Sequence, residues 1–196
     1  MELSRCGKPD LWRQLFRLSV AALHHCYSPH RALFENYRVS RYGATLFESR
    51  DSFIMRLATR LGFTLSYETI AVHLNDGRFG GVRNSSVPNY VYRWTEREIE
   101  KTIDCFEPLA RHRFHYSYAA SPPNLPNRLK KGTVARLAVS LLKAPYQLFA
   151  VALPRQQNLF AVFIEKPDIQ EHHFEWLVAD DDHWRFDKDW GNSVFK

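Results

Sequence analysis

The pattern of apolar and polar residues near the start of the chain predicts a strand, a helix and a second strand. Residues 19–23 (SVAAL) are mostly apolar and lead into a polar turn, after which Ser28 and Pro29 are typical first residues of a helix. Apolar positions then recur at helical spacing at Ala32, Leu33 and Tyr37. Residues 44–47 form a short apolar run, which predicts the second strand. We expect a unit of this length to be a right-handed crossover between neighbouring parallel strands.

Two further helices have clear start signals. Asp51 or Ser52 can cap a helix that ends before Gly62, and its apolar face comprises Phe53, Ile54, Leu57, Ala58 and Leu61. Thr95 and Glu98 have the spacing of a capping box. The helix that follows presents an inward face made of Ile99, Thr102, Ile103 and Phe106.

Alternating or continuous apolar runs predict the remaining strands. Residues 70–74 alternate through Ile70, Val72 and Leu74, and residues 111–118 alternate through Phe114, Tyr116 and Tyr118. Residues 148–153 and 159–164 are two apolar runs joined by a polar turn, so they predict a hairpin. A helix is expected to begin at Thr133.

Ionisable residues follow the two predicted parallel strands at the point where each strand ends. His24, His25 and Cys26 follow the first strand, and Glu48 and Arg50 follow the second. Ligands of an open parallel sheet bind outside the carboxyl ends of its strands. We therefore expect these residues to line a functional site.

Composition and charge narrow the class of protein. The 196 residues suit one domain, and 45% hydrophobic residues suffice for a core. The net charge of +6 is spread along the chain, and the densest basic group, Arg128 with Lys130 and Lys131, is too small to predict nucleic-acid binding. Three distant cysteines fit the reduced thiols of a cytosol. Since neither a secretory leader nor a membrane-length apolar run is recognisable, we expect a cytoplasmic protein without membrane partners.

One longer pattern resembles a known family. The motif LHHC-x-SPHRAL-x-E-x-x-RV, followed by Gly43 and a strand that ends in Glu48, resembles the class I S-adenosylmethionine-dependent methyltransferases. The segments GGVRNSSVPNYVYRWTEREIEKTI (80–103) and QNLFAVFIEKP (157–167) extend the likeness, which covers roughly 23–190. The resemblance implies an α/β fold with a mixed, Rossmann-like sheet, in which helices lie on the faces and the last strand runs antiparallel to the rest.

The resemblance covers only the carboxyl-terminal half of the family's domain. Members begin with a strand and a glycine-rich loop that holds the cofactor, and no such loop is found before Leu23. We therefore expect an atypical leader at 1–18, an incomplete methyltransferase-like domain at 19–167 with a substrate-side insertion at about 63–94, and a peripheral tail at 168–196. S-adenosylmethionine is the implied cofactor, but no residue of this chain is assigned to it.

The incomplete domain leaves several functions open. The chain alone is expected to be inactive as a methyltransferase for a small molecule. Its expected partners are a small-molecule substrate and either a chain that supplies the missing half or a second copy of itself. The alternative is a non-catalytic remnant or subunit that pairs through its open sheet edge. Residues 1–18 are either an arbitrary leader or an amphipathic helix after Pro9, which covers that edge or touches a membrane surface.

The resemblance also implies roles for individual side chains. Methyl transfer requires alignment of the acceptor and, for an oxygen or nitrogen acceptor, removal of a proton. His25 is the first candidate for this base and His24 the second, because imidazole exchanges its proton near neutral pH. Alternatively, one histidine packs in the core and the other caps the following helix. Glu48 is expected to orient substrate or water, or to pair with Arg50 or Arg31.

Further substrate contacts are expected from the end of the second strand and from the insertion, at Arg50, Arg83, Asn84, Tyr90 and Arg93. For Tyr90, half-buried packing is the alternative. The tail contains the sequences Glu171-His172-His173 and Asp180-Asp181-Asp182, but neither has the ligand spacing of a metal motif, so no metal site is predicted. The tail is expected to pack onto the domain through Trp176, Trp184 and Trp190.

Overall fold

The computed structural model describes residues 16–20, 22–120, 145, 148–149, 151–180 and 183–195. In chain order its elements are β1 (Phe16–Val20), the 3-10 turn η1 (Leu23–His25), α2 (Pro29–Arg38), β2 (Gly43–Ser49), α3 (Phe53–Arg60), α4 (Thr69–Leu74), η2 (Val82–Asn84), α5 (Glu96–Phe106), β3 (Arg113–Ala119), η3 (Pro154–Gln156), β4 (Leu159–Glu165), α8 (Ile169–His172), β5 (Leu177–Asp180), β6 (His183–Phe186) and α9 (Lys188–Val194). The predicted helix from Thr133 falls outside the described residues. So does the predicted leader helix after Pro9, except for its last apolar residue, Phe16, which is the first residue of β1.

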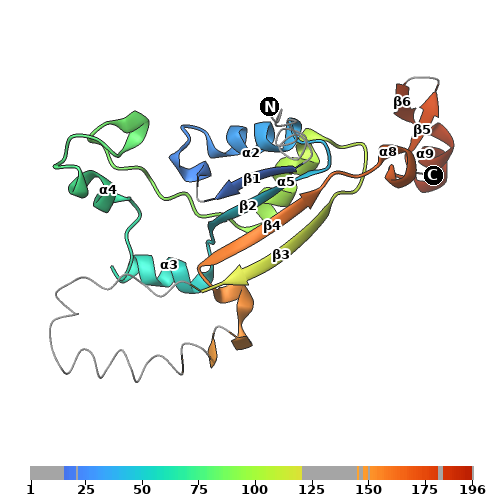
Figure 1. Cartoon of the computed structure of the whole chain (residues 1–196). Helices are drawn as coiled ribbons and strands as arrows, with labels where there is room; N and C mark the ends of the chain where they lie inside the picture. The colour runs from blue at the N-terminus through green and yellow to red at the C-terminus, as the bar shows by residue number, and fades with distance from the viewer. Residues whose placement is uncertain are drawn as a thin grey trace, which may run out of the picture.

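Four strands form a mixed sheet in the order β1-β2-β4-β3, shown side by side in Figure 1. β1 and β2 are parallel and are joined by α2, which confirms the predicted parallel crossover. β4 is antiparallel to both of its neighbours. The fold is therefore α/β with a mixed sheet, and the last strand of that sheet along the chain runs against the other three, as expected.

The core lies between one face of the sheet and helices α2 and α5. Residues that alternate along β2 and β4 point to this face and are buried: Ala44, Leu46, Phe160, Val162 and Ile164. They pack against Leu33 and Tyr37 of α2 and against Ile99 and Ile103 of α5. On the other face, Phe47 is 44% exposed. The predicted face of β3 also packs on the core through Phe114, Tyr116 and Tyr118.

The helix starts predicted at Ser52 and Thr95 are confirmed. The side chain of Ser52 accepts a hydrogen bond from the backbone N–H of Met55 at the start of α3. Thr95 and Glu98 form a reciprocal capping box at the start of α5. Gly62 has a φ of +76°, which suits its predicted place after the end of α3. Although α3 forms as predicted, none of its side chains is buried.

The first strand lies earlier in the chain than predicted. β1 spans Phe16–Val20 rather than 19–23, so it begins inside the predicted leader, and the histidines lie in η1 rather than directly after the strand. The reason is the side chain of Glu48. Its Oε1 accepts the backbone N–H groups of Ala22 and Leu23, which would otherwise continue a strand, so the chain turns there.

Two predicted strands are helical. Residues 70–74 lie in α4, in which Val72 is the one buried residue, and a single inward side chain does not distinguish a period of 2 from one of 3.6. Leu148, Phe149, Val151 and Ala152 are helical, so 148–153 is not the first strand of a hairpin. β2 and β3 already occupy both edges of β4, which leaves no place in the sheet for another partner of that strand.

The tail forms a small unit at one end of the sheet (Figure 1). β5 and β6 are an antiparallel pair, and aromatic side chains gather around Trp176, which stacks on Phe174 at 4.3 Å and lies 5.6 Å from Trp190. The guanidinium of Arg111 lies over the ring of Phe174, and Ala110 bridges to His173, so these contacts join the tail to the residues before β3. Trp184 lies outside the group around Trp176 and contacts the ring of His173, which is also in the tail.

A search of the described helices finds none that combines the length and the apolar character needed to cross a lipid bilayer.

Candidate functional site

The candidate site is built on a buried carboxylate at the end of β2. Glu48 lies on the same face of β2 as Ala44 and Leu46 and is 2% exposed. Its Oε1 accepts the N–H of Ala22 at 3.0 Å and the N–H of Leu23 at 2.9 Å. These two bonds hold the carboxylate still and fix the turn that carries the histidines.

The two histidines lie next to Glu48 with their rings close together. Nδ1 of His24 is 3.3 Å from Oε2 of Glu48, and the His24 side chain is 9% exposed. The centres of the His24 and His25 rings lie 4.2 Å apart, and Nδ1 of His25 is 2.9 Å from Nδ2 of Asn89. The predicted convergence of His24, His25 and Glu48 is therefore observed, and His24 is the histidine that contacts the carboxylate.

A second carboxylate faces both imidazoles. Oε2 of Glu68 lies 3.9 Å from Nε2 of His24 and 3.6 Å from Nε2 of His25. Glu68 and Asn89 are also joined through the backbone, since the N–H of Glu68 donates to the carbonyl of Asn89 at 2.8 Å. Sequence reasoning missed both residues. Glu68 stands just before a segment that was predicted as a strand, and no local motif marks either residue.

The histidines border a cavity of about 380 Å³. The opposite side comes from the insertion, and among its lining residues are Arg83, Asn89, Tyr90 and Tyr92. The guanidinium of Arg83 also lies 5.0 Å from the centre of the Tyr27 ring. The hydroxyl of Tyr92 donates to Glu98, and burial, followed by this bond, raises the pKa of Tyr92 to about 12. Tyr92 is therefore a neutral hydrogen-bonding group at neutral pH.

The turn that presents Arg83 has an uncommon backbone. Arg83 and Asn84 have φ values of +52° and +58°, a region that side-chain-bearing residues rarely adopt. The Asn84 side chain accepts the N–H of Gly80, so it holds the turn and is not among the residues that line the cavity. A Cβ at Gly81 would collide with the carbonyl of Val87, because the backbone there folds back on itself. The loop thus has a defined shape over the cavity.

Tyr90 and Arg93 occupy different places. Tyr90 lines the cavity, is 53% exposed and packs edge-on against Tyr67. The guanidinium of Arg93 donates to the carbonyl of Leu65, away from the lining residues. Burial lowers the pKa of Arg93, although Asp51 opposes this effect. Arg93 therefore ties the two ends of the insertion together in this structure.

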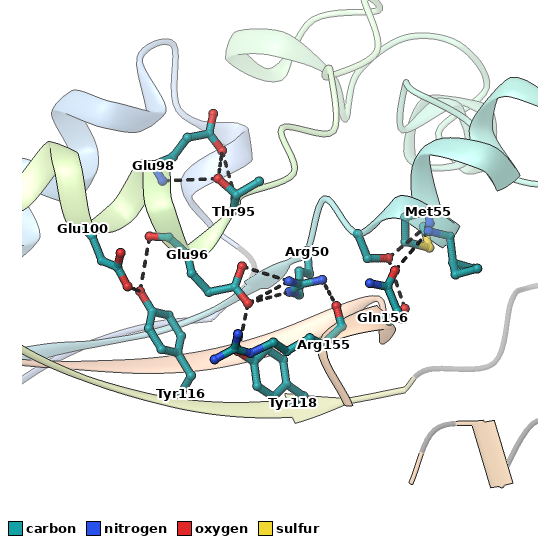
Figure 2. A network of polar contacts seen from close by, with 12 residues as sticks. Arg50, Met55, Thr95, Glu96, Glu98, Glu100, Tyr116, Tyr118, Arg155 and Gln156 are labelled. Carbon is teal, nitrogen blue, oxygen red and sulfur yellow. Dashed lines mark hydrogen bonds and ion pairs between the residues drawn. The ribbon is translucent and has the colours of Figure 1, made fainter. Parts of the chain in front are cut away.

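Arg50 is engaged elsewhere, as Figure 2 shows. Its guanidinium makes three hydrogen bonds of 2.7–3.0 Å to the carboxylate of Glu96 and a further one to the carbonyl of Arg155. The hydroxyl of Tyr118 also donates to Glu96, at 2.8 Å. Arg50 is 8% exposed and does not line the cavity. It joins the end of β2 to the start of α5 and to η3.

The ionisation of Glu96 should make stability depend on pH. Burial alone raises the pKa of this carboxyl, but hydrogen bonds from its own backbone amide, from Arg50 and from Tyr118 together lower it below the ordinary value. Such a group adds stability that is fully present above the unfolded-state pKa of about 4.3 and is lost as the pH falls through the folded-state value. Between about pH 5 and pH 3 we expect the free energy of unfolding to fall less steeply with decreasing pH in Glu96→Gln than in the wild type.

Urea unfolding at a series of pH values measures this effect. The matched control is Glu35→Gln, which alters an exposed carboxylate that pairs with Arg38. Equal acid slopes for the wild type and Glu96→Gln would contradict the prediction.

The assembled geometry is a fixed carboxylate, two adjacent imidazoles tilted by 37° and a second carboxylate beside an aromatic cavity. Such a group of residues can accept a proton, orient a polar small molecule or hold a metal ion. Comparison of the chain with protein-family models, with curated proteins and with solved structures gave no match.

Proposed function

We propose that this chain is the acceptor-binding half of an S-adenosylmethionine-dependent methyltransferase that acts on a small molecule. The observation that carries the proposal is the pair His24–Glu48 near the ends of two parallel strands, in which His24 borders the cavity and Glu48 lies buried behind it. Support also comes from the sheet, whose last strand along the chain runs antiparallel as the family resemblance implies.

The pair has the arrangement of a general base and its orienting carboxylate. With Nδ1–H of His24 directed at Glu48, Nε2 is free to accept a proton from an acceptor O–H or N–H group in the cavity. Glu48 then stabilises the imidazolium, and its own position is held by the Ala22 and Leu23 amides. Tyr90, Tyr92 and Arg83 provide aromatic surface, a hydroxyl and a positive charge that suit a polar aromatic or anionic small molecule.

The described residues do not fit the whole cofactor. Among them no glycine-rich loop stands between a strand and a helix, since Gly43 opens β2 and Gly80 and Gly81 lie in the loop before η2. The proposal therefore covers acceptor binding and deprotonation, and it assigns S-adenosylmethionine to a partner chain that contains the glycine-rich half. Among the described residues β1 is an edge strand, and its Leu18 and Val20 are 66% and 60% exposed, so β1 is the expected pairing position.

The same exposed edge supports a second candidate, a non-catalytic subunit that pairs through β1 and leaves the cavity unused. Labelling distinguishes the two. S-adenosylmethionine with a tritiated methyl group is incubated with an extract of the source organism, which provides acceptors and partner chains, and with added purified chain.

We expect the added wild-type chain to increase tritium in low-molecular-weight products and His24→Gln to abolish the increase. His115→Gln is the control, because this histidine is exposed and pairs with Glu165 far from the cavity residues in sequence. An increase that His24→Gln leaves unchanged, or no increase at all, would reject the proposal.

A further inference from the structure

Three potential metal ligands converge at the edge of the cavity. One ring nitrogen each of His24 and His25 and a carboxylate oxygen of Glu68 all lie within 4.8 Å of one another, and no other group of this kind is found among the described residues. The distances of 3.9 and 3.6 Å from Glu68 Oε2 to the two nitrogens are too long for hydrogen bonds. The three atoms thus face one point without bonding to each other.

Oε2 of Glu68 is buried and has no hydrogen-bond partner among the described residues. A buried carboxylate oxygen without a partner costs free energy, so it normally has a bound group beside it. The nearest ligand atoms are the two imidazole nitrogens, and a cation between the three would satisfy all of them at once.

We infer that His24, His25 and Glu68 form a binding site for a divalent first-row transition metal of the zinc class. Bonds of about 2.0–2.2 Å in a tetrahedral site place ligand atoms about 3.3 Å apart, so the observed separations need to shrink by less than about 1.5 Å. Two imidazoles and one carboxylate are a recurrent ligand set of metals that keep an open position. Magnesium and calcium prefer sites made of oxygen atoms only.

The surroundings of the ligands support this inference. Metal-bound histidines usually donate their second N–H to a carboxylate or an amide oxygen, which fixes the ring orientation. Oε2 of Glu48 stands opposite Nδ1 of His24, and the Asn89 amide stands opposite Nδ1 of His25. A half-turn of the Asn89 amide directs its oxygen at Nδ1 of His25. That oxygen then accepts a hydrogen bond from Nδ1–H, so the neutral ring has no proton on Nε2, which can bind the metal.

A metal here would act on the same cavity as the proposed methyl acceptor. Its open position would bind the acceptor oxygen or nitrogen and make that O–H or N–H group more acidic, with the proton passing to water. It would therefore replace His24 Nε2 in that task. This role rests on the proposed function, whereas metal binding itself does not, because the ligands are all on this chain.

The test is a titration of the full chain with Zn²⁺ alone, monitored by calorimetry. A second titration uses Co²⁺, whose visible absorption reports tetrahedral nitrogen and oxygen ligands. We expect one Zn²⁺ per chain. Glu48→Gln should weaken binding about 10–100-fold through the orientation of His24, and Glu68→Gln should weaken it at least as much. Glu171→Gln is the matched control, since that residue stands in the other Glu-His-His sequence of the chain.

Thermal unfolding monitored by circular dichroism shows that each variant is folded before titration, and Oε2 of Glu68 has no hydrogen bond to a described residue that the substitution would remove. Failure to bind one Zn²⁺, or binding that Glu68→Gln leaves intact, would overturn the inference. Metal binding without tritium transfer refutes only the methyltransferase proposal, and transfer without metal binding refutes only the metal site.

Discussion

Replacement of Arg50 by alanine is expected to lower the free energy of unfolding by about 3–5 kcal/mol, the range for breaking a buried ion pair by removing one partner. The arginine is 8% exposed and its guanidinium bonds Glu96 through two nitrogens. Without it, the Glu96 carboxylate keeps its charge in a largely buried position, and the carbonyl of Arg155 loses a donor. Chemical denaturation followed by circular dichroism measures the loss.

Arg38→Ala is the control for this prediction. Arg38 also pairs with a glutamate at 2.7 Å, but its side chain and that of Glu35 are 57% and 51% exposed. A surface pair of this kind contributes about 0.2–1 kcal/mol. Arg50→Lys keeps the charge but not the planar fork, and should fall between the two. Equal losses for Arg50→Ala and Arg38→Ala would show that burial does not govern the strength of this pair.

Glu48→Ala should have the second large effect, a loss of about 3 kcal/mol or more in the free energy of unfolding. The reason is that the backbone N–H groups of Ala22 and Leu23 lose their acceptor, and an unsatisfied buried donor costs about 1–3 kcal/mol. Glu48→Gln keeps one carbonyl oxygen for these amides and should cost clearly less. Denaturation curves of both variants measure the difference.

Glu165→Ala is the matched control for Glu48→Ala. Glu165 also lies 3.3 Å from a histidine, His115, but both side chains are exposed and neither accepts a backbone N–H from η1. Its loss should change stability by less than about 1 kcal/mol. If Glu48→Gln were as destabilising as Glu48→Ala, the turn would depend on the carboxylate charge rather than on its hydrogen bonds.

Local signals in the sequence predicted the parts of the fold that local interactions determine. Ser52 and Thr95 cap helices because their side chains reach backbone N–H groups within the next three residues. The parallel crossover that brings His24 near Glu48 follows from one helix between two short strands. These features need no knowledge of distant contacts.

Apart from the strand predicted at 70–74, whose periodicity is ambiguous locally, the failed predictions depend on distant contacts. The end of β1 is determined by Glu48, which is far along the chain from Ala22. Residues 148–153 look like a strand, but the edges of β4 are taken by β2 and β3. Arg93 and Asn89 join the two arms of the insertion, and Asn89 contacts His25, which brings Glu68 to the histidines; no spacing rule connects residues so far apart.

The central position of β4 has a consequence for how the protein forms. β2 and β3 do not hydrogen-bond to one another, and each depends on β4, which is synthesised after both. Until the ribosome has released that late segment, the β1–β2 pair and β3 are separate, and the edge of β2 and of β3 that later pairs with β4 has unpaired backbone N–H and C=O groups. Such long-range pairing is slow, and meanwhile the exposed strand edges can aggregate with other chains. We therefore expect the supply of chaperones to govern the yield of this protein in cells.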